Sequence, residues 1–294
     1  MLKIFWYLNN ITNILNYINL ILQYIRIKNH EEHPMNEDIT LNKEFPILEF
    51  DDSIPAVIEP SGKIKKINIP EHAVICFFRE VFEKLDNSGK LKLIINIYSE
   101  IGPHPVYELE FQGKKITVFH PGIGAPLAAG ITEEVIALGC TKFIACGGAG
   151  VLNKDIAVGH VIIPVSAVRD EGTSYHYMPP GREACANKEA VDALIRTLDK
   201  HSCKYITGKT WTTDAYYRET PKKVILRRNE GCITVEMETA AFFAVAQFRK
   251  IKFAQLLYGG DDVSCDEWDS RQYTTRTDVR ENLFWFAVEA CLEL

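Results

Sequence analysis

Residues 233–262 have the sequence ITVEMETAAFFAVAQFRKIKFAQLLYGGDD, and this stretch decides the fold. The apolar run at 233–237 is typical of a buried strand, and the alanine-rich segment at 238–248 is typical of a helix. A second apolar run at 253–258 then ends in two glycines and two aspartates. Strand and helix in alternation imply a mainly parallel sheet covered by helices.

The same alternation continues along most of the chain. We expect further helices at 125–138, 187–200, 221–229 and 277–292, and further strands at 73–78, 92–99, 106–111, 115–120, 142–146, 160–168 and 204–213. The turn signal Gln112-Gly113-Lys114 joins two early strands into a meander. The predicted fold class is therefore α/β, a single domain with a central mixed, largely parallel twisted sheet flanked by helices.

The bulk composition fits one large globular domain with a small-molecule ligand. The chain has 294 residues, of which 47% are hydrophobic and 24% are charged, so it can bury a large core. Its net charge of -6 argues against nucleic acid as a partner, because nucleic-acid binding needs a basic face. The eight cysteines form no C-x-x-C pair and lie mostly in apolar runs, which predicts reduced thiols, no metal and a cytoplasmic location.

The first 34 residues differ in composition from the rest. The run at 4–27 is rich in Ile, Leu, Tyr and Asn and lacks Gly, Pro and acidic residues. Five asparagines disfavour a stable membrane span, and no small-residue cleavage site follows to make a signal peptide. We divide the chain into an apolar extension at 1–34, either a surface helix or a non-native extension upstream of Met35, a polar segment at 35–67, and a domain at 68–294.

Two glycine-rich segments follow predicted strands. His120-Pro121-Gly122-Ile123-Gly124 leads into a helix, and Gly147-Gly148-Ala149-Gly150 follows the next strand. Glycines let the backbone approach a ligand, and free amides at a helix start attract anions such as phosphate. One Gly-x-Gly is usually a plain turn, but two such segments in one sheet favour a binding site at the carboxyl ends of the strands.

Two pairs of carboxylates also lie at strand ends. Glu236 and Glu238 flank Met237, and in an extended backbone both acids would project to one side. Asp261 and Asp262 end the last strand, where shielding from water would leave one of them protonated and able to act as a general acid. Each pair also has a structural explanation without catalysis. Glu238 would be favoured at the positive end of a helix dipole, and Asp261 and Asp262 could belong to a solvated Asp-rich turn.

These segments resemble the superfamily of nucleoside phosphorylases and nucleosidases. The resemblance runs from about Ala73 to the C-terminus, and its most specific part is Val235-Glu236-Met237-Glu238. The superfamily includes purine nucleoside and uridine phosphorylases and methylthioadenosine/adenosylhomocysteine nucleosidases. The resemblance implies a nucleoside phosphorylase-like domain and a pentosyltransferase of nucleoside salvage that releases free base and ribose 1-phosphate.

The resemblance also implies roles for single residues. Glu238 matches the acid that binds the ribose hydroxyls, Met237 packs against the sugar and Glu236 helps to position it. Asp262 matches the aspartate that protonates the leaving base in purine-cleaving members. Tyr216 matches an aromatic wall of the base pocket. Other expected substrate contacts are His176, Gly147 and Gly148.

The expected phosphate site departs from the superfamily pattern. Its usual arginines are absent, which leaves Gly122, Gly124 and Arg79 as the candidates for binding phosphate. Glu80 aligns instead with the glutamate that activates water in nucleosidases. Phosphorolysis with inorganic phosphate as co-substrate and no cofactor is the first expectation, and hydrolysis is the alternative. A nucleoside-binding or storage protein without turnover is a third hypothesis, because fold alone does not establish activity. The resemblance further implies a homo-oligomer.

Overall fold

The computed structural model describes residues 41–265 and 267–294. The prediction for residues 1–34 lies outside these ranges. The compact unit is Lys43–Leu294. Its helices are α2 (Pro60–Lys63), α3 (Arg79–Asn87), α4 (Ala125–Leu138), α5 (Lys188–Lys200), α6 (Pro221–Asn229), α7 (Thr239–Arg249) and α8 (Thr277–Cys291), with short 3-10 turns η1 (Pro46–Leu48), η2 (Thr173–His176), η3 (Tyr216–Arg218) and η4 (Tyr273–Thr275).

The strands are β1 (His72–Cys76), β2 (Leu91–Ser99), β3 (Gly102–Phe111), β4 (Lys114–Phe119), β5 (Lys142–Val151), β6 (Val161–Asp170), β7 (Glu183–Cys185), β8 (Tyr205–Thr213), β9 (Cys232–Glu236) and β10 (Lys252–Asp262). They form one sheet in the order β10-β6-β8-β9-β5-β1-β4-β3-β2, with β7 paired to β6. β10 also pairs with β5, so β5, β10, β6, β8 and β9 close into a ring. The sheet is mixed, as predicted: β10, β5, β1 and β4 are mutually parallel, whereas β2, β3 and β4 form the antiparallel meander.

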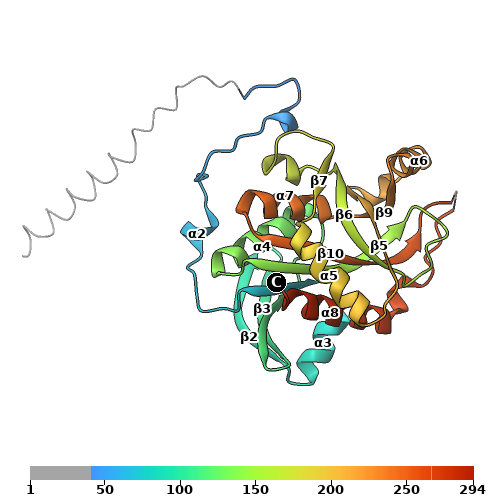
Figure 1. The fold of residues 1–294 in the computed structure, drawn as a ribbon. Helices are drawn as coiled ribbons and strands as arrows, with labels where there is room; N and C mark the ends of the chain where they lie inside the picture. The colour runs from blue at the N-terminus through green and yellow to red at the C-terminus, as the bar shows by residue number, and fades with distance from the viewer. Residues whose placement is uncertain (1–40, 266) are drawn as a thin grey trace, which may run out of the picture. The chain divides into compact units, whose positions relative to one another are not determined.

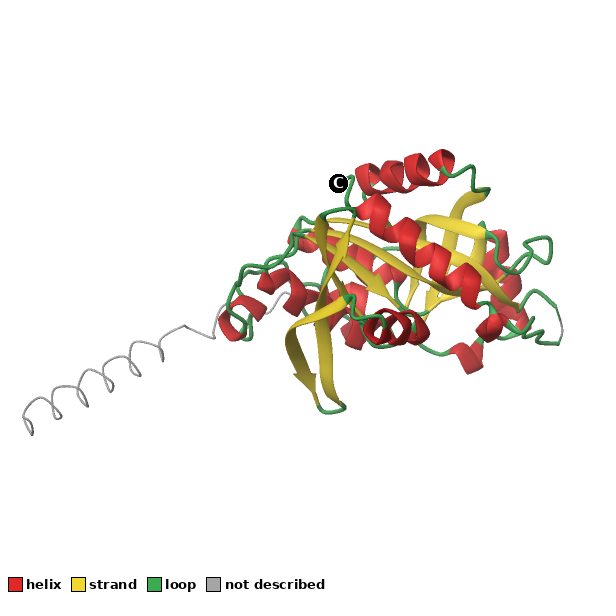
Figure 2. Cartoon of the chain, turned by 90° about the horizontal axis from the view of Figure 1, so that it is seen from below, coloured by secondary structure: helices red, strands yellow, loops and turns green. Residues whose placement is uncertain are grey.

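Helices cover both faces of this sheet (Figure 1). α3, α5 and α8 bury one large apolar cluster, which includes Leu194, Phe284 and Val288. α4 and α7 bury a second cluster, which includes Phe242 and Phe253. α6 covers a third, smaller cluster around Trp211 next to β8 and β9. Figure 2 shows the twisted sheet between its helical layers, with the β2–β3 hairpin extending away from them.

Local signals explain why several helices begin and end where they do. The Thr220 side chain caps α6 by accepting a hydrogen bond from the Lys223 amide, and Pro221 occupies the first helical position. Gly139 ends α4 with a positive φ of 133°, a conformation that glycine adopts without steric cost. The predicted bounds of α4 and α6 are therefore confirmed.

The structure also corrects parts of the predicted path. α3 lies between the first strand and the meander, where no helix was predicted. β5 continues to Val151, five residues past its predicted end at Cys146, so the second glycine segment is strand rather than loop. None of the helices among the described residues is long and apolar enough to cross a membrane.

Candidate active site

Glu236 is a buried carboxylate that joins three elements. One carboxyl oxygen accepts from the Thr212 hydroxyl at 2.6 Å, and the other accepts from the amides of Glu238 and Thr239 at 2.7 and 2.6 Å. Burial raises the pKa of this carboxyl even though these donors oppose the shift. Glu236 therefore fixes the start of α7 against β8. Its role in positioning the sugar stays a prediction.

Glu238 lies two residues further on, and its carboxyl has a different partner. Its Oε1 accepts a hydrogen bond from the Gly124 amide at 2.7 Å, so it lies at the first glycine segment. Burial, together with the negative charge of Glu236, raises the pKa of Glu238 to about 8. The backbone at Glu238 is no longer extended, with φ -140° and ψ -29°. The backbone therefore leaves the extended form at Glu238, and the two glutamates have different hydrogen-bond partners.

The backbone amides of Gly122 and Gly124, in the first glycine segment, donate hydrogen bonds to other groups of the protein. Gly124 donates to Glu238, and Gly122 donates to Nδ1 of His120 at 3.0 Å. Both glycines have positive φ, 82° and 86°. Burial lowers the pKa of His120, which favours the neutral imidazole. The predicted phosphate contacts through Gly122 and Gly124 would therefore compete with hydrogen bonds that already exist.

The second glycine segment is closely packed strand. A Cβ on Gly147 would lie 3.1 Å from the Phe77 ring, and one on Gly148 would lie 3.1 Å from the Tyr258 ring. These glycines allow two aromatic rings to approach the sheet, and Phe77 also meets His120 edge-on with ring centres 5.8 Å apart. The segment is therefore strand rather than loop. Contact of Gly147 and Gly148 with substrate stays a prediction.

The two charged residues at the start of α3, Arg79 and Glu80, form ion pairs with other side chains of the protein. Arg79 has an 87% exposed side chain and pairs with Glu83 at 2.7 Å, one turn along α3. Glu80 pairs at 2.9 Å with Arg280, whose guanidinium lies over the Phe78 ring. The predicted roles of Arg79 in phosphate binding and of Glu80 in water activation would both require these ion pairs to open.

Asp261 and Asp262 do not form a pair. Asp262 is buried, accepts from the Ser264 amide at 2.8 Å and forms an ion pair with Arg271. Arg271 also donates to the Ile156 carbonyl at 2.7 Å. Burial acts to raise the pKa of Asp262, but these hydrogen bonds and the Arg271 charge outweigh it, so the pKa is lowered. The expectation that Asp262 holds a proton near neutrality is therefore wrong.

Asp261 has different surroundings. Its Oδ2 accepts from the Trp268 indole at 2.7 Å. Its Oδ1 lies 3.5 Å from the point that a Cβ on Gly150 would occupy, over the β5–β9 pair. Consecutive residues of a strand face opposite sides of the sheet, so Asp261 faces the side opposite to that of Asp262.

Two residues expected to bind substrate lie on the surface around the strand ends. Tyr216, in η3, is 54% exposed and lies against Tyr217 with ring centres 4.2 Å apart. His176, in η2, is also exposed. Nearby, Arg169 is buried and donates to Ser174 and to the Pro179 carbonyl, which fixes the chain around η2.

Sequence reasoning missed three residues that shape this region. Thr212 links β8 to Glu236 and also accepts from the Ala240 amide at 2.9 Å. Trp268 binds Asp261. Glu219, just before α6, is half-buried, and burial together with the Asp261 charge raises its pKa to about 7. The available signal for Glu219 was an acid two residues after the tyrosine pair Tyr216-Tyr217 in the segment that follows β8.

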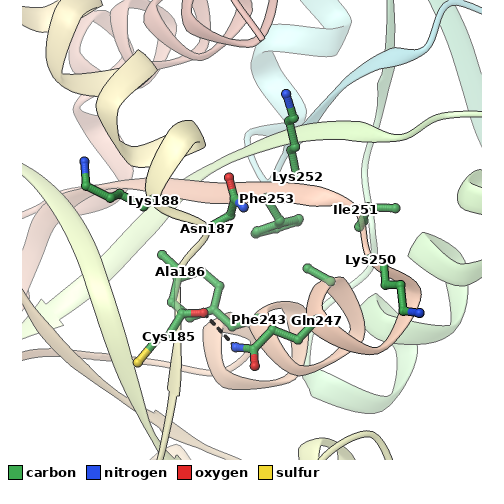
Figure 3. A pocket seen from close by; sticks show the side chains of 11 residues that line it. Cys185, Ala186, Asn187, Lys188, Phe243, Gln247, Lys250, Ile251, Lys252 and Phe253 are labelled. Atoms are coloured by element: carbon green, nitrogen blue, oxygen red, sulfur yellow. Dashed lines mark hydrogen bonds between the residues drawn. The ribbon is translucent and has the colours of Figure 1, made fainter.

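A cavity of about 560 Å³ lies elsewhere (Figure 3). Its lining includes Asn187 and Lys188 at the start of α5 and Lys252 at the start of β10, and Gln247 donates to the Cys185 carbonyl beside it. The candidate site described above is at the carboxyl end of β10, so this cavity is not part of it. In the described part of the chain, no three His, Cys, Asp or Glu side chains are grouped to hold a metal.

A comparison with protein families matches residues 71–289 to the model described as "Phosphorylase superfamily". The chain belongs to the phosphorylase superfamily. This confirms the predicted family, and it places the Glu238 segment, the first glycine segment and the end of β10 inside the matched region.

Individual members of the superfamily are similar to this chain at modest identity. A guanosine phosphorylase of Halorubrum lacusprofundi is 28% identical over 149 residues, which cover 51% of this chain and 62% of that protein. The matched stretch thus spans less than two thirds of this curated relative. The curated relatives are named as phosphorylases. Nucleoside phosphorylases are pentosyltransferases, which is the enzyme class predicted from the sequence.

Solved structures show the same fold. A purine nucleoside phosphorylase of Toxoplasma gondii, solved with immucillin-H, has a TM-score of 0.66 and 20% identity, covering 79% of this chain and 92% of its own. An AMP nucleosidase of Bacteroides thetaiotaomicron has a TM-score of 0.62 and 22% identity, covering 79% and 90%. The predicted α/β fold is therefore confirmed.

Proposed function

We propose that this protein is a nucleoside phosphorylase, which cleaves the N-glycosidic bond of a nucleoside with inorganic phosphate and releases free base and ribose 1-phosphate. The observation that carries the proposal is Glu238, a buried carboxyl at the end of β9, held by the Gly124 amide. A buried carboxyl with one protein donor retains acceptor positions for the sugar hydroxyls.

The surrounding residues support sugar binding at this point. Glu236 holds the start of α7 and therefore the backbone of Glu238. Met237, between them, is partly exposed and offers an apolar contact to the ribose ring. Holding the sugar in this way orients C1′ toward the attacking oxygen, and orientation is a large source of rate enhancement.

Hydrolysis is the second candidate, because specific contacts favour it. The Gly122 and Gly124 amides have protein acceptors, Phe77 packs on Gly147, and Arg79 points outward. A neutral His120 next to these segments suits a water nucleophile better than a phosphate dianion, which prefers cations and free amides.

A nucleoside panel assayed with and without phosphate tests both candidates. Base release that requires phosphate establishes phosphorolysis, and release without phosphate establishes hydrolysis. Glu238→Ala should reduce either activity by roughly 10²-fold or more, since it removes the group that orients the sugar. The matched control is Glu134→Gln, a carboxylate of α4 that pairs with Lys63. Nucleoside binding with no release by the wild-type protein would contradict both candidates and indicate a binding protein.

A further inference from the structure

The cavity of Figure 3 has a lining that suits an anionic ligand. It lies between the start of α5, the end of α7 and the start of β10, and its volume of about 560 Å³ is within the usual range for small-molecule sites. Among the described residues that line it, three are lysines (Lys188, Lys250 and Lys252) and none is Asp or Glu. The whole chain has a net charge of -6, so this lining differs in sign from the average surface.

The three lysines belong to three different elements and lie on different sides of the cavity (Figure 3). The Lys188 amino group pairs with the exposed Asp192 at 2.6 Å. The Lys252 amino group pairs with the exposed Glu189 at 2.5 Å, and Lys250 forms no ion pair with a described residue. Ion pairs between exposed side chains are weak, so these flexible amino groups can turn to a ligand of higher charge.

The start of α5 adds further hydrogen-bond donors to the same wall. The side-chain oxygen of Asn187 caps the helix by accepting from the Ala190 amide at 3.0 Å, which leaves its NH2 group as a donor. Other amides of the first turn have no partner within the helix, and the helix dipole favours an anion there. At the end of α7 the opposite charge is reduced, because the Ala246 carbonyl accepts from the Ile251 amide at 3.0 Å.

Positive charge continues along the amino ends of the neighbouring strands. His72, Lys142 and Lys252 are in register in the parallel strands β1, β5 and β10, so their side chains leave the sheet on the same face. Nζ of Lys142 lies 3.4 Å from Nε2 of His72 and pairs with Glu71 at 2.8 Å. Burial lowers the pKa of His72, and the charges of Lys142 and Lys252 act in the same direction. An anion beside Lys252 therefore lies in a potential to which several cations contribute.

This cavity is separate from the proposed sugar site. Glu238 precedes α7 and Lys250 follows it, while Lys252 begins β10 and Asp262 ends it. Both elements have eleven residues, which correspond to about 16 Å of helix and about 30 Å of strand. One nucleoside cannot contact both places.

We propose that this cavity is a second ligand site, which binds the phosphate group of a small phosphate ester through its three lysines and the start of α5. Lysine amino groups and free amides at a helix start both suit phosphate. The apolar part of the lining, which includes Ala186, Phe243 and Ile251, can accept the organic part of the ester. Binding here requires no turnover, so the proposal stands apart from the proposed function.

Cys185 gives a local readout of binding, because it is exposed and lines the cavity. Cys265 is exposed in the loop after the other end of β10 and is the internal reference. N-ethylmaleimide labelling of the full chain, followed for each cysteine by mass spectrometry, should slow at Cys185 but not at Cys265 when ribose 5-phosphate is added. Ribose at the same concentration, and sodium chloride at the same ionic strength, should have no effect. A parallel arm with inorganic phosphate shows whether the free ion binds as well as the ester.

Two substitutions with opposite effects separate binding from a purely structural role. Lys252→Gln removes a cation and should weaken the protection by ribose 5-phosphate about 10-fold or more. Glu189→Gln removes the carboxylate that competes for Lys252 and should strengthen the protection about 2- to 5-fold. Lys204→Gln, exposed beyond the other end of α5, is the matched control and should leave the protection unchanged.

Three results would overturn the proposal: equal protection by ribose, protection confined to Cys265, or no protection by either phosphate compound. A change in the same direction in Lys252→Gln and Glu189→Gln would also overturn it, because it would show that only the loss of their ion pair matters.

Discussion

At the scale of single residues, Glu236 and Glu238 show how different partners separate two neighbouring carboxyls. Glu236 accepts three hydrogen bonds, whereas Glu238 accepts one from Gly124. Burial raises the pKa of both carboxyls, and the three donors to Glu236 act against that shift. A protonated Glu238 can donate to a sugar oxygen as well as accept from a hydroxyl.

Glu238→Gln should change stability in a pH-dependent way. The pKa of Glu238 is raised from 4.5 to about 8 in the folded protein. Its contribution to stability is therefore fully present below pH 4.5 and is lost as pH rises through 8. Glutamine stays neutral, so the variant should melt several degrees above the wild type at pH 9 and close to it at pH 5, as measured by calorimetry. A difference in Tm that does not grow with pH would contradict this.

At the scale of elements, the turn from β4 into α4 decides where Glu238 finds its partner. Gly122 has a φ of 82°, and a Cβ there would lie 2.3 Å from Cδ2 of Leu127, in the first turn of α4. Left-handed backbone costs other residues about 1–2 kcal/mol, and the clash adds to this cost. Backbone conformation and packing against Leu127 therefore explain the glycine at position 122 without a bound ligand.

Gly122→Ala should lower the free energy of unfolding by about 1–3 kcal/mol and weaken nucleoside cleavage, since it displaces the turn that holds Glu238. Gly130→Ala is the matched control on the same element. Gly130 is exposed within α4, and a Cβ there meets nothing within 4 Å. Alanine should stabilise this helix by up to about 1 kcal/mol. Denaturant titration of both variants should give opposite signs, and equal signs would refute the argument.

At the scale of the whole molecule, the sequence predicted those features that depend on local signals. The bounds of α4 and α6 follow from a glycine, a threonine cap and a proline within a few residues of each end. The extension of β5 to Val151 depends instead on pairing with β9 and β10, which are distant in sequence. Asp261 and Asp262 take separate partners, Trp268 and Arg271, from the loop after β10, and no cap or turn signal in the sequence indicates this pairing.

The cysteines offer a test of the whole described fold, because all eight lie within it. Cys185 and Cys265 are exposed, whereas five are buried and Cys203 is intermediate. Burial raises the pKa of Cys140, Cys232 and Cys291 to about 12, and the thiolate is the reactive form. A thiol reagent at pH 8 should therefore label two cysteines rapidly, with Cys203 slower and the other five only after unfolding. Replacing Cys185 and Cys265 by serine should remove the rapid phase, and rapid labelling that persists would show that the buried clusters open in solution.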